Sequence, residues 1–202
     1  MKIKLLSLFI LVMSTIYIFL IPSEPFWLKI LFKLIPMWLI IYFAFIQRTD
    51  RVRTNKGLIL AGLVFCMFGD GLLHWFLIGL SCFLIGHIIY IFGFLKRWTF
   101  SALRFLSILP LLAFDFFIGN LLVQALQESG KDDLIIPVIF YIGAISIMAW
   151  AAFMTGNLFA IVGSLLFVVS DTVLSWNMFV SDVPYSHVLI MTTYYAAQYC
   201  IA

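Results

Sequence analysis

Charged residues are scarce in this chain. Of its 202 residues only 10% are Asp, Glu, Lys or Arg, while 65% are hydrophobic. A soluble domain has about 25% charged and about 45–50% apolar residues. The chain therefore has too few polar side chains to cover a water-soluble fold, and lipid must cover part of its surface. The high aromatic content, 18% of the chain, agrees, because aromatic side chains fill helix interfaces and mark the membrane boundary.

The sequence also lacks the patterns of several common functional sites, which excludes the corresponding classes of function. The three cysteines, Cys66, Cys82 and Cys200, stand in apolar runs without the spacing of a metal site or a disulfide framework. The basic residues form no nucleic-acid-binding stripe, and there is no phosphate-binding glycine loop, nucleophile elbow or dinucleotide fingerprint. A zinc site would have to use Asp70, His87 and Asp171, which is fewer histidines than hydrolytic zinc generally takes. We therefore predict no metal and no cofactor.

Long apolar runs occupy almost the whole chain. A bilayer core takes about 20 apolar residues per helix, and short polar or proline-containing breaks separate runs of that length. The run that begins at Leu5 could be a signal peptide, but no small-residue cleavage site precedes Pro22. We therefore predict an all-α polytopic membrane protein, a single transmembrane domain over 1–202, with spans near 4–21, 26–46, 57–74, 76–94, 101–126, 134–153, 157–177 and 186–202.

Loop charges predict the orientation. Cytoplasmic loops carry an excess of Lys and Arg. With eight spans, one side holds Lys131 together with five acidic residues. The other side holds Lys2, Lys4, Arg48, Arg51, Arg53, Lys56, Lys96, Arg97 and Arg104. This pattern predicts a multi-pass protein of the cell (inner) membrane with both termini in the cytoplasm.

The third and seventh spans resemble each other. The series Gly62, Asp70, Leu73 and Trp75 recurs with the same spacing as Gly163, Asp171, Leu174 and Trp176. This is compatible with a parallel repeat of two four-helix halves. Each aspartate follows the predicted cytoplasmic start of its span by about 13–14 residues, or about 20 Å of helix. We therefore expect both carboxylates at one depth in the outer half of the bilayer.

Asp70 and Asp171 are the main candidates for chemistry. An ionisable side chain within a span costs several kcal/mol unless it faces a partner or a wet cavity. The two could be structural hydrogen-bond acceptors between helices. Alternatively they form an acid–base pair, because two carboxyl groups in one apolar site can differ in protonation, so that one delivers a proton and the other activates water. We favour the acid–base pair.

Other polar side chains could complete the site. His87 and Tyr90 share one helix face, as do Tyr194 and Gln198, and together they could line the cavity that the aspartates reach. Each could instead make an ordinary polar contact in the bundle. Within the spans, Lys33 could contact a phosphate or neutralise a carboxylate; the remaining ionisable residues are Lys29, which could snorkel to the headgroups, and Asp115, which could pair with a lysine.

Four short segments resemble one known family. Residues 65–73 read F-C-M-F-G-D-G-L-L, and Gly163 with 166–171 reads as G-x-x-L-F-V-V-S-D. Gly79, Phe83, His87 and Tyr90 fit G-x-x-x-F-x-x-x-H-x-x-Y, and 193–198 read T-Y-Y-A-A-Q. In order, spacing and chain length these segments resemble the YhhN-like lysoplasmalogenase family, whose members are eight-helix membrane enzymes.

The resemblance implies an activity. It implies hydrolysis of the vinyl-ether bond of lysoplasmalogens to a fatty aldehyde and glycerophosphoethanolamine or glycerophosphocholine. Asp70 and Asp171 would then be catalytic, and Lys33, His87, Tyr90, Tyr194 and Gln198 would bind or orient the substrate. The expected partners are the lysophospholipid substrate and membrane lipid, with no nucleic acid and no particular oligomeric state. A small transporter or proton or cation relay that uses the same Asp/His cluster is the main alternative, and a lipid-binding scaffold is another.

Overall fold

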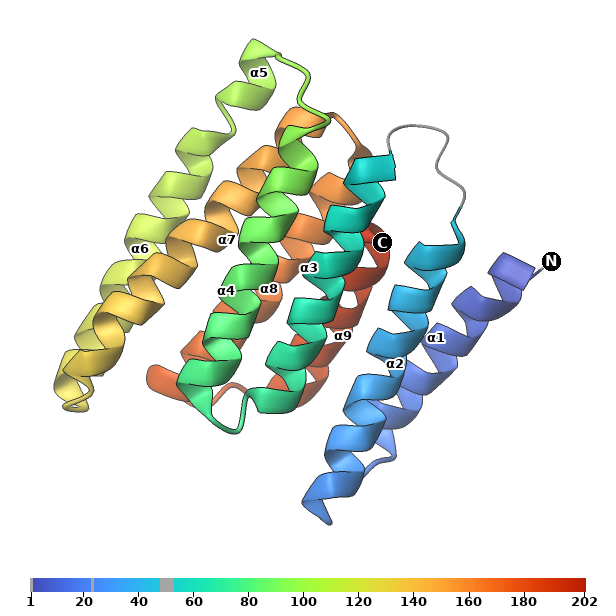
Figure 1. The fold of residues 1–202 in the computed structure, drawn as a ribbon. Coiled ribbons are helices and arrows are strands. Elements are labelled where there is room, and N and C mark those ends of the chain that lie inside the picture. Colours follow the sequence, from blue (N-terminus) through green and yellow to red (C-terminus); the bar gives the residue numbers. More distant parts are fainter. Residues whose placement is uncertain (1, 23, 48–52) are drawn as a thin grey trace.

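The computed structural model describes residues 2–22, 24–47 and 53–202, and within these ranges it is almost entirely helical, with no β-strand. Eight long helices run along roughly one axis in that part of the chain (Figure 1). A short helix, α5, and a 3-10 turn, η1, connect some of them. The elements are α1 (Lys2–Phe19), α2 (Phe26–Ile46), α3 (Arg53–Leu72), α4 (Phe76–Leu95), α5 (Ala102–Phe105), α6 (Ile108–Glu128), η1 (Asp132–Leu134), α7 (Ile135–Thr155), α8 (Leu158–Phe179) and α9 (Ser186–Ile201).

The predicted polytopic all-α fold is confirmed. Among the described residues, six segments are long and apolar enough to cross a membrane, and α1 contains a shorter apolar segment, Ile3–Phe19. The helix α9 has 16 residues, which corresponds to about 24 Å. It is shorter than a typical bilayer core, but it packs along α8 inside the bundle.

The predicted span 101–126 is not one continuous helix. It is divided into α5 and α6, with Leu106 and Ser107 between them. Pro110 has no N–H group and so cannot donate to the carbonyl of Leu106, which a continuous helix would require. The Ser107 hydroxyl instead donates to the Arg104 carbonyl at 2.6 Å. Pro110 is tolerated because it lies in the first turn of α6.

Helices α3 and α4 pack closely, and so do α8 and α9. Small residues allow this approach. A side chain added at Gly69 of α3 would meet the Phe83 ring of α4 at 2.7 Å. One added at Gly163 of α8 would meet the Ala197 carbonyl oxygen of α9 at 2.9 Å. These two helix pairs lie in the centre of the bundle, with α1 and α2 at one edge and α6 at the other (Figure 1).

The inward faces of α3 and α8 support the predicted repeat. Positions that are 101 residues apart are buried together on the two helices. The helix that precedes each of them in the chain also packs against it: α2 packs on α3, and α7 packs on α8. The matching buried pairs are Gly62 and Gly163, Leu63 and Ser164, Cys66 and Phe167, and Met67 and Val168. Asp70 and Asp171 therefore occupy corresponding places on corresponding helices.

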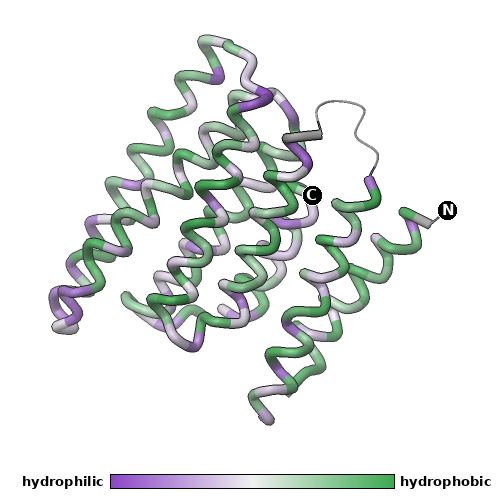
Figure 2. Tube along the Cα trace, in the orientation of Figure 1, coloured by the Kyte–Doolittle hydropathy of each residue, from purple (hydrophilic) through white to green (hydrophobic). Residues whose placement is uncertain are grey.

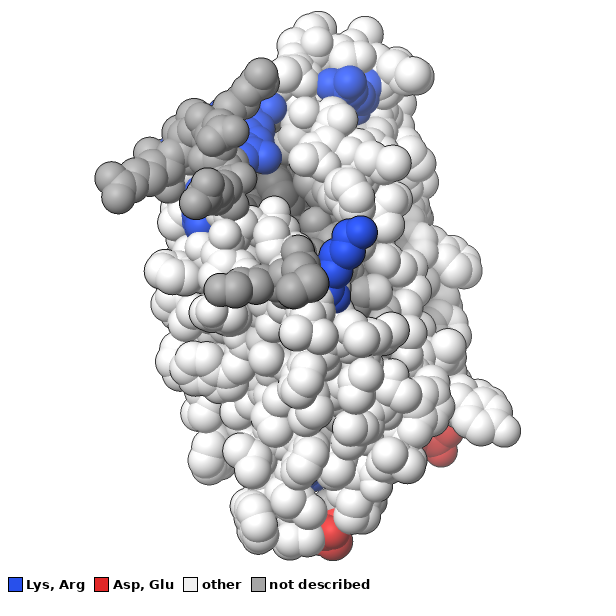
Figure 3. Space-filling model, turned by 90° about the vertical axis from the view of Figure 1, so that its right-hand side faces the viewer, with Lys and Arg blue, Asp and Glu red and all other residues white. Residues whose placement is uncertain are grey.

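Charge separates toward the two ends of the bundle. Hydrophobic residues dominate the length of the helices (Figure 2). On the face drawn in Figure 3, Lys and Arg side chains gather at the end where α3 begins, and Asp and Glu side chains appear at the opposite end. Arg48 and Arg51, which contribute to the orientation predicted from the sequence, lie outside the described residues. An apolar belt between two charged ends is the expected surface of a protein that spans a membrane.

Candidate active site

Asp70 lies near the end of α3 in a charged, closed environment. Its side chain is only 3% exposed. One carboxylate oxygen is 3.0 Å from the Lys33 ammonium of α2, and the other accepts a hydrogen bond from the Tyr194 hydroxyl of α9 at 2.5 Å. Tyr195 donates to the Lys33 carbonyl at 2.8 Å. The ion pair is neutral as a unit and is held from three helices, which makes its burial tolerable.

Asp171 occupies the corresponding position on α8, but its surroundings differ. Its carboxylate accepts a hydrogen bond from the Tyr141 hydroxyl of α7. Among the described residues the Lys33–Asp70 contact is the only ion pair, so Asp171 has no cationic partner there. The Asp171 carboxyl therefore relies on a neutral hydrogen-bond donor where Asp70 has an ammonium group.

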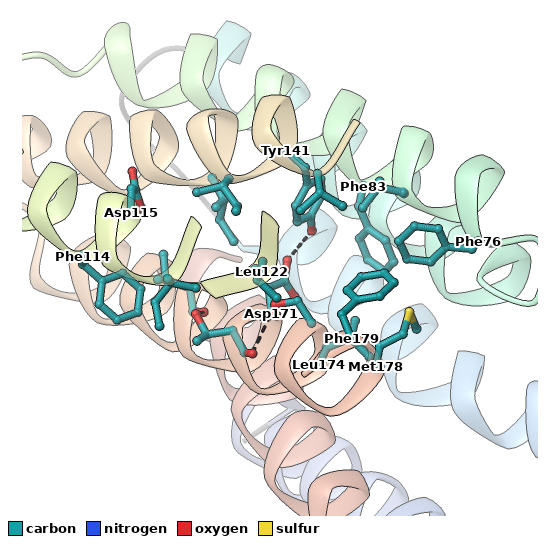
Figure 4. Close-up of a pocket in the computed structure, with 18 of the residues that line it drawn as sticks. Phe76, Phe83, Phe114, Asp115, Leu122, Tyr141, Asp171, Leu174, Met178 and Phe179 are labelled. Atoms are coloured by element: carbon teal, nitrogen blue, oxygen red, sulfur yellow. Dashed lines mark hydrogen bonds between the residues drawn. The ribbon is translucent and has the colours of Figure 1, made fainter. Parts of the chain in front are cut away.

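An apolar pocket opens beside Asp171. It lies between α4, α6, α7 and α8 with a cavity volume of about 60 Å³, and most of its walls are Leu, Ile, Val and Phe side chains. Figure 4 shows Asp171 at the pocket wall with its bond to Tyr141, while Phe76, Met178 and Phe179 lie toward one end. Its lining is mainly hydrocarbon, which suits a short segment of a lipid chain.

A second carboxyl group, that of Asp115, lines the same pocket. It is half-buried on α6 and accepts a hydrogen bond from the Ser146 hydroxyl of α7 at 2.6 Å. In Figure 4 it lies well apart from Asp171, near Phe114. Asp115 is thus paired with a serine, and not with a lysine.

An aromatic layer separates the two aspartates. The His87 ring lies 5.2 Å from the Tyr141 ring and 4.7 Å from the Phe167 ring, measured between centroids. Phe167 in turn lies 5.5 Å from Tyr194, the tyrosine that binds Asp70. A continuous series of rings therefore joins the partner of Asp171 to the partner of Asp70. His87 is fully buried, and within the described part of the chain neither of its nitrogen atoms has a hydrogen-bond partner.

Tyr90 and Gln198 form a separate pair. The Tyr90 hydroxyl donates to the Gln198 side-chain oxygen at 2.7 Å, and both residues are fully buried. The Gln198 amide nitrogen has no hydrogen-bond partner among the described residues. The contact between Tyr90 and Gln198 ties α4 to α9.

The predicted site residues thus fall into three groups. Lys33, Asp70 and Tyr194 meet, Tyr90 and Gln198 meet, and His87 packs beside the tyrosine that binds Asp171. Of the seven residues only Asp171 lines the apolar pocket. The shared cavity expected from the sequence is therefore replaced by two half-sites with an aromatic layer between them.

Tyr141 is the functional residue that sequence reasoning missed. A signal was available, because Tyr141 is the only tyrosine of the span predicted at 134–153. A buried phenol in an apolar helix usually finds a hydrogen-bond partner. Which partner it finds depends on how α7 is rotated about its axis relative to α8, and the sequence alone does not predict that rotation.

The fold and the site together define a class: a polytopic helical membrane protein with an intramembrane carboxyl group at the wall of an apolar pocket. The chain belongs to the YhhN family, which matches residues 28–202. Its membership confirms the resemblance found in the four sequence segments.

Characterised relatives share most of the chain. The protein is 33% identical over 201 residues to lysoplasmalogenase TMEM86B of Homo sapiens, a match that covers 97% of this chain and 84% of the relative. It is 30% identical over 203 residues to TMEM86B of Sus scrofa, covering 98% and 85%. It is 31% identical over 198 residues to lysoplasmalogenase TMEM86A of Bos taurus, covering 89% and 79%. No solved structure matches the chain significantly.

Proposed function

We propose that this protein is a lysoplasmalogenase, which hydrolyses the vinyl-ether bond of a lysoplasmalogen to a fatty aldehyde and glycerophosphoethanolamine or glycerophosphocholine. Family membership and relatives named for this activity support the proposal. The observation that carries it is the Asp171 carboxyl group, which faces an apolar pocket without a cation to neutralise it. A water-poor pocket that presents an acid to a lipid chain suits this reaction.

The chemistry requires a proton on carbon. Protonation of the vinyl carbon remote from the ether oxygen gives an oxocarbenium ion, and water adds to the carbon attached to that oxygen. The hemiacetal that results then breaks its bond to the glycerol oxygen, which leaves as an alcohol, and the aldehyde is released. The protein must therefore supply an acid, stabilise a cation and accept a proton from water.

Asp171 can take part in all three steps. Protonated, its carboxyl group donates to the vinyl carbon, while the Tyr141 hydroxyl fixes its orientation. After donation the group is an anion beside the new cation, where the apolar walls strengthen their attraction. The same carboxylate then accepts the proton of the attacking water.

Asp70 contributes the negative end of a buried ion pair behind the aromatic layer. The Lys33 ammonium and the Tyr194 hydroxyl hold it as a carboxylate, and it contacts the pocket only through the rings of that layer. Its role in this proposal is electrostatic and positional. His87 packs against the Tyr141 ring and so helps to position the tyrosine that bonds to Asp171. Tyr90 and Gln198 support the α4–α9 packing beneath it.

The orientation also forms part of the proposal. The end of the bundle rich in Lys and Arg faces the cytoplasm of a cell with this protein in its inner membrane, so both termini are cytoplasmic. The substrate then enters from the outer leaflet, because Asp171 lies beyond the middle of α8 when counted from its basic end. Reporter fusions to each loop would test this arrangement.

A substrate comparison tests the function. Purified protein in detergent should release aldehyde from lysoplasmenylethanolamine and leave the matched lysophospholipid with an ester-linked chain intact, because an ester has no vinyl carbon to protonate. Absence of aldehyde from folded protein would refute the proposal. Solute movement across vesicles without aldehyde would instead favour the transporter alternative.

A further inference from the structure

A second hollow lies at the outer end of the Asp171 pocket. It is lined by residues of the α3–α4 turn, the segment before α7 and the end of α8: Trp75, Phe76, Leu77, Ile78, Lys131, Leu134, Met178 and Phe179. It is open, and Trp75 at its edge is 58% exposed. A half-exposed tryptophan at a helix start is typical of the headgroup boundary of a membrane.

The outer hollow and the Asp171 pocket lie next to each other. Phe76, Met178 and Phe179 line both of them. The rings of Phe76 and Phe179 meet edge to face with centroids 5.5 Å apart, so this aromatic pair forms the border between the two spaces. A molecule that occupies both would keep an apolar part beside Asp171 and a polar part at the surface.

Among the residues that the structure describes, Lys131 is the only cationic one that lines either space. Its ammonium group lies 5.7 Å from the centre of the Phe179 ring. Lys131 makes no ion pair with the described part of the chain, although Asp132 and Asp133 follow it directly. The ammonium group is therefore available to an anion that reaches the hollow.

The spacing suits a lysolipid. Phe179 follows Asp171 by eight residues along α8, a rise of about 12 Å. A glycerophosphate group and the long lysine side chain can together span that length. We infer that Lys131 binds the phosphate of the substrate headgroup in the outer hollow, so that the vinyl ether comes to rest beside Asp171. This inference rests on the proposed function, because it assigns the two ends of its substrate.

Binding of uncleavable analogues tests the inference without turnover. The probes are a 1-alkyl-glycerophosphocholine and the 1-alkylglycerol of equal chain length, both saturated ethers, titrated into purified protein in detergent. The phosphate-bearing probe should bind the unchanged protein about tenfold more tightly. Lys131→Gln should remove this preference while leaving the affinity for alkylglycerol unchanged, and Lys131→Arg should keep the preference.

Lys29→Gln is the matched control. Lys29 lies near the same end of the bundle on α2 but lines neither space, so its substitution should leave the preference intact. Equal affinity of the unchanged protein for both probes would overturn the inference, and so would a preference that survives in Lys131→Gln. A phosphate preference that depends on Lys131, in a protein that releases no aldehyde, would instead leave the headgroup site standing and refute the proposed hydrolysis.

Discussion

Asp70 and Asp171 occupy corresponding positions on corresponding helices, yet one is closed within an ion pair and the other borders a pocket. The preceding helix accounts for the difference: α2 contributes the Lys33 ammonium to Asp70, whereas α7 contributes the Tyr141 hydroxyl to Asp171. A carboxylate beside a cation is held in its charged form. A carboxyl group that meets only a phenol and hydrocarbon keeps the freedom to exchange a proton. The comparison teaches that two like residues at corresponding positions on two helices can take different tasks through one partner each.

Substitution of the pocket carboxyl should have the largest effect on activity. Asp171→Asn keeps the size of the side chain and can still bond to Tyr141, but it cannot deliver a proton to carbon. Aldehyde release should fall by about 10²–10⁴-fold, the usual contribution of general acid catalysis. Thermal unfolding in detergent should stay close to that of the unchanged protein. Full activity in this variant would show that a group other than Asp171 protonates the vinyl carbon.

Substitutions in the Asp70 half-site should mainly change the stability of the protein. Lys33→Met leaves a buried carboxylate without its cation, which typically costs about 3–5 kcal/mol. The double variant Lys33→Met with Asp70→Asn removes both charges and should recover most of the loss, as measured by thermal unfolding. We expect the recovered protein to release aldehyde about tenfold more slowly, because the dipole of the ion pair, whose negative end contacts the aromatic layer, is gone. A double variant less stable than either single one would contradict the ion-pair account.

Tyr141→Phe should have an intermediate effect. It removes the only hydrogen bond that the described side chains make to the Asp171 carboxylate. The loss of a hydrogen bond to a charged group is worth about 1.5–3 kcal/mol, so kcat should fall by about tenfold or more. Tyr199→Phe is the control, because its hydroxyl bonds to Ser7 between α9 and α1, far from the pocket. Equal loss in both variants would indicate a general packing effect.

Asp115→Asn should change activity least. Asp115 shares the pocket with Asp171, but its bond to Ser146 can also be made by an asparagine side chain. Aldehyde release should stay within about twofold of the unchanged protein, as is usual for substitutions away from the reacting atoms. A loss of activity as large as that of Asp171→Asn would show that the reaction needs both carboxyl groups of the pocket. Asp115, and not Asp70, would then be the residue to compare with Asp171.

The arrangement of helices was predictable because it depends on segment properties. Apolar run length sets the spans, and the equal spacing of Asp70 and Asp171 along two similar segments indicates their common place in the fold. The pairing of Lys33 with a carboxylate was also among the predicted possibilities. The division of one span at Ser107 was missed, since Pro110 is compatible both with a helix start and with a kinked helix.

The contacts of the site were harder to predict because they depend on helix rotation and on side chains from distant segments. Nothing in the local pattern around Asp171 indicates that a tyrosine 30 residues earlier reaches it. The aromatic layer of His87 and Phe167 likewise consists of residues whose individual positions suggest ordinary core packing. Spacing along one helix identified residues that share a face, but not the surface that each face meets.

The central claim is that the Asp171 carboxyl meets the reacting carbons of the substrate. A lysolipid analogue with an epoxide in place of the vinyl double bond tests it, since a carboxyl that protonates the epoxide oxygen can open the ring and remain attached as an ester. Mass spectrometry of the labelled protein should find this ester on Asp171. An ester on Asp70, with Asp171 unmodified, would contradict the account.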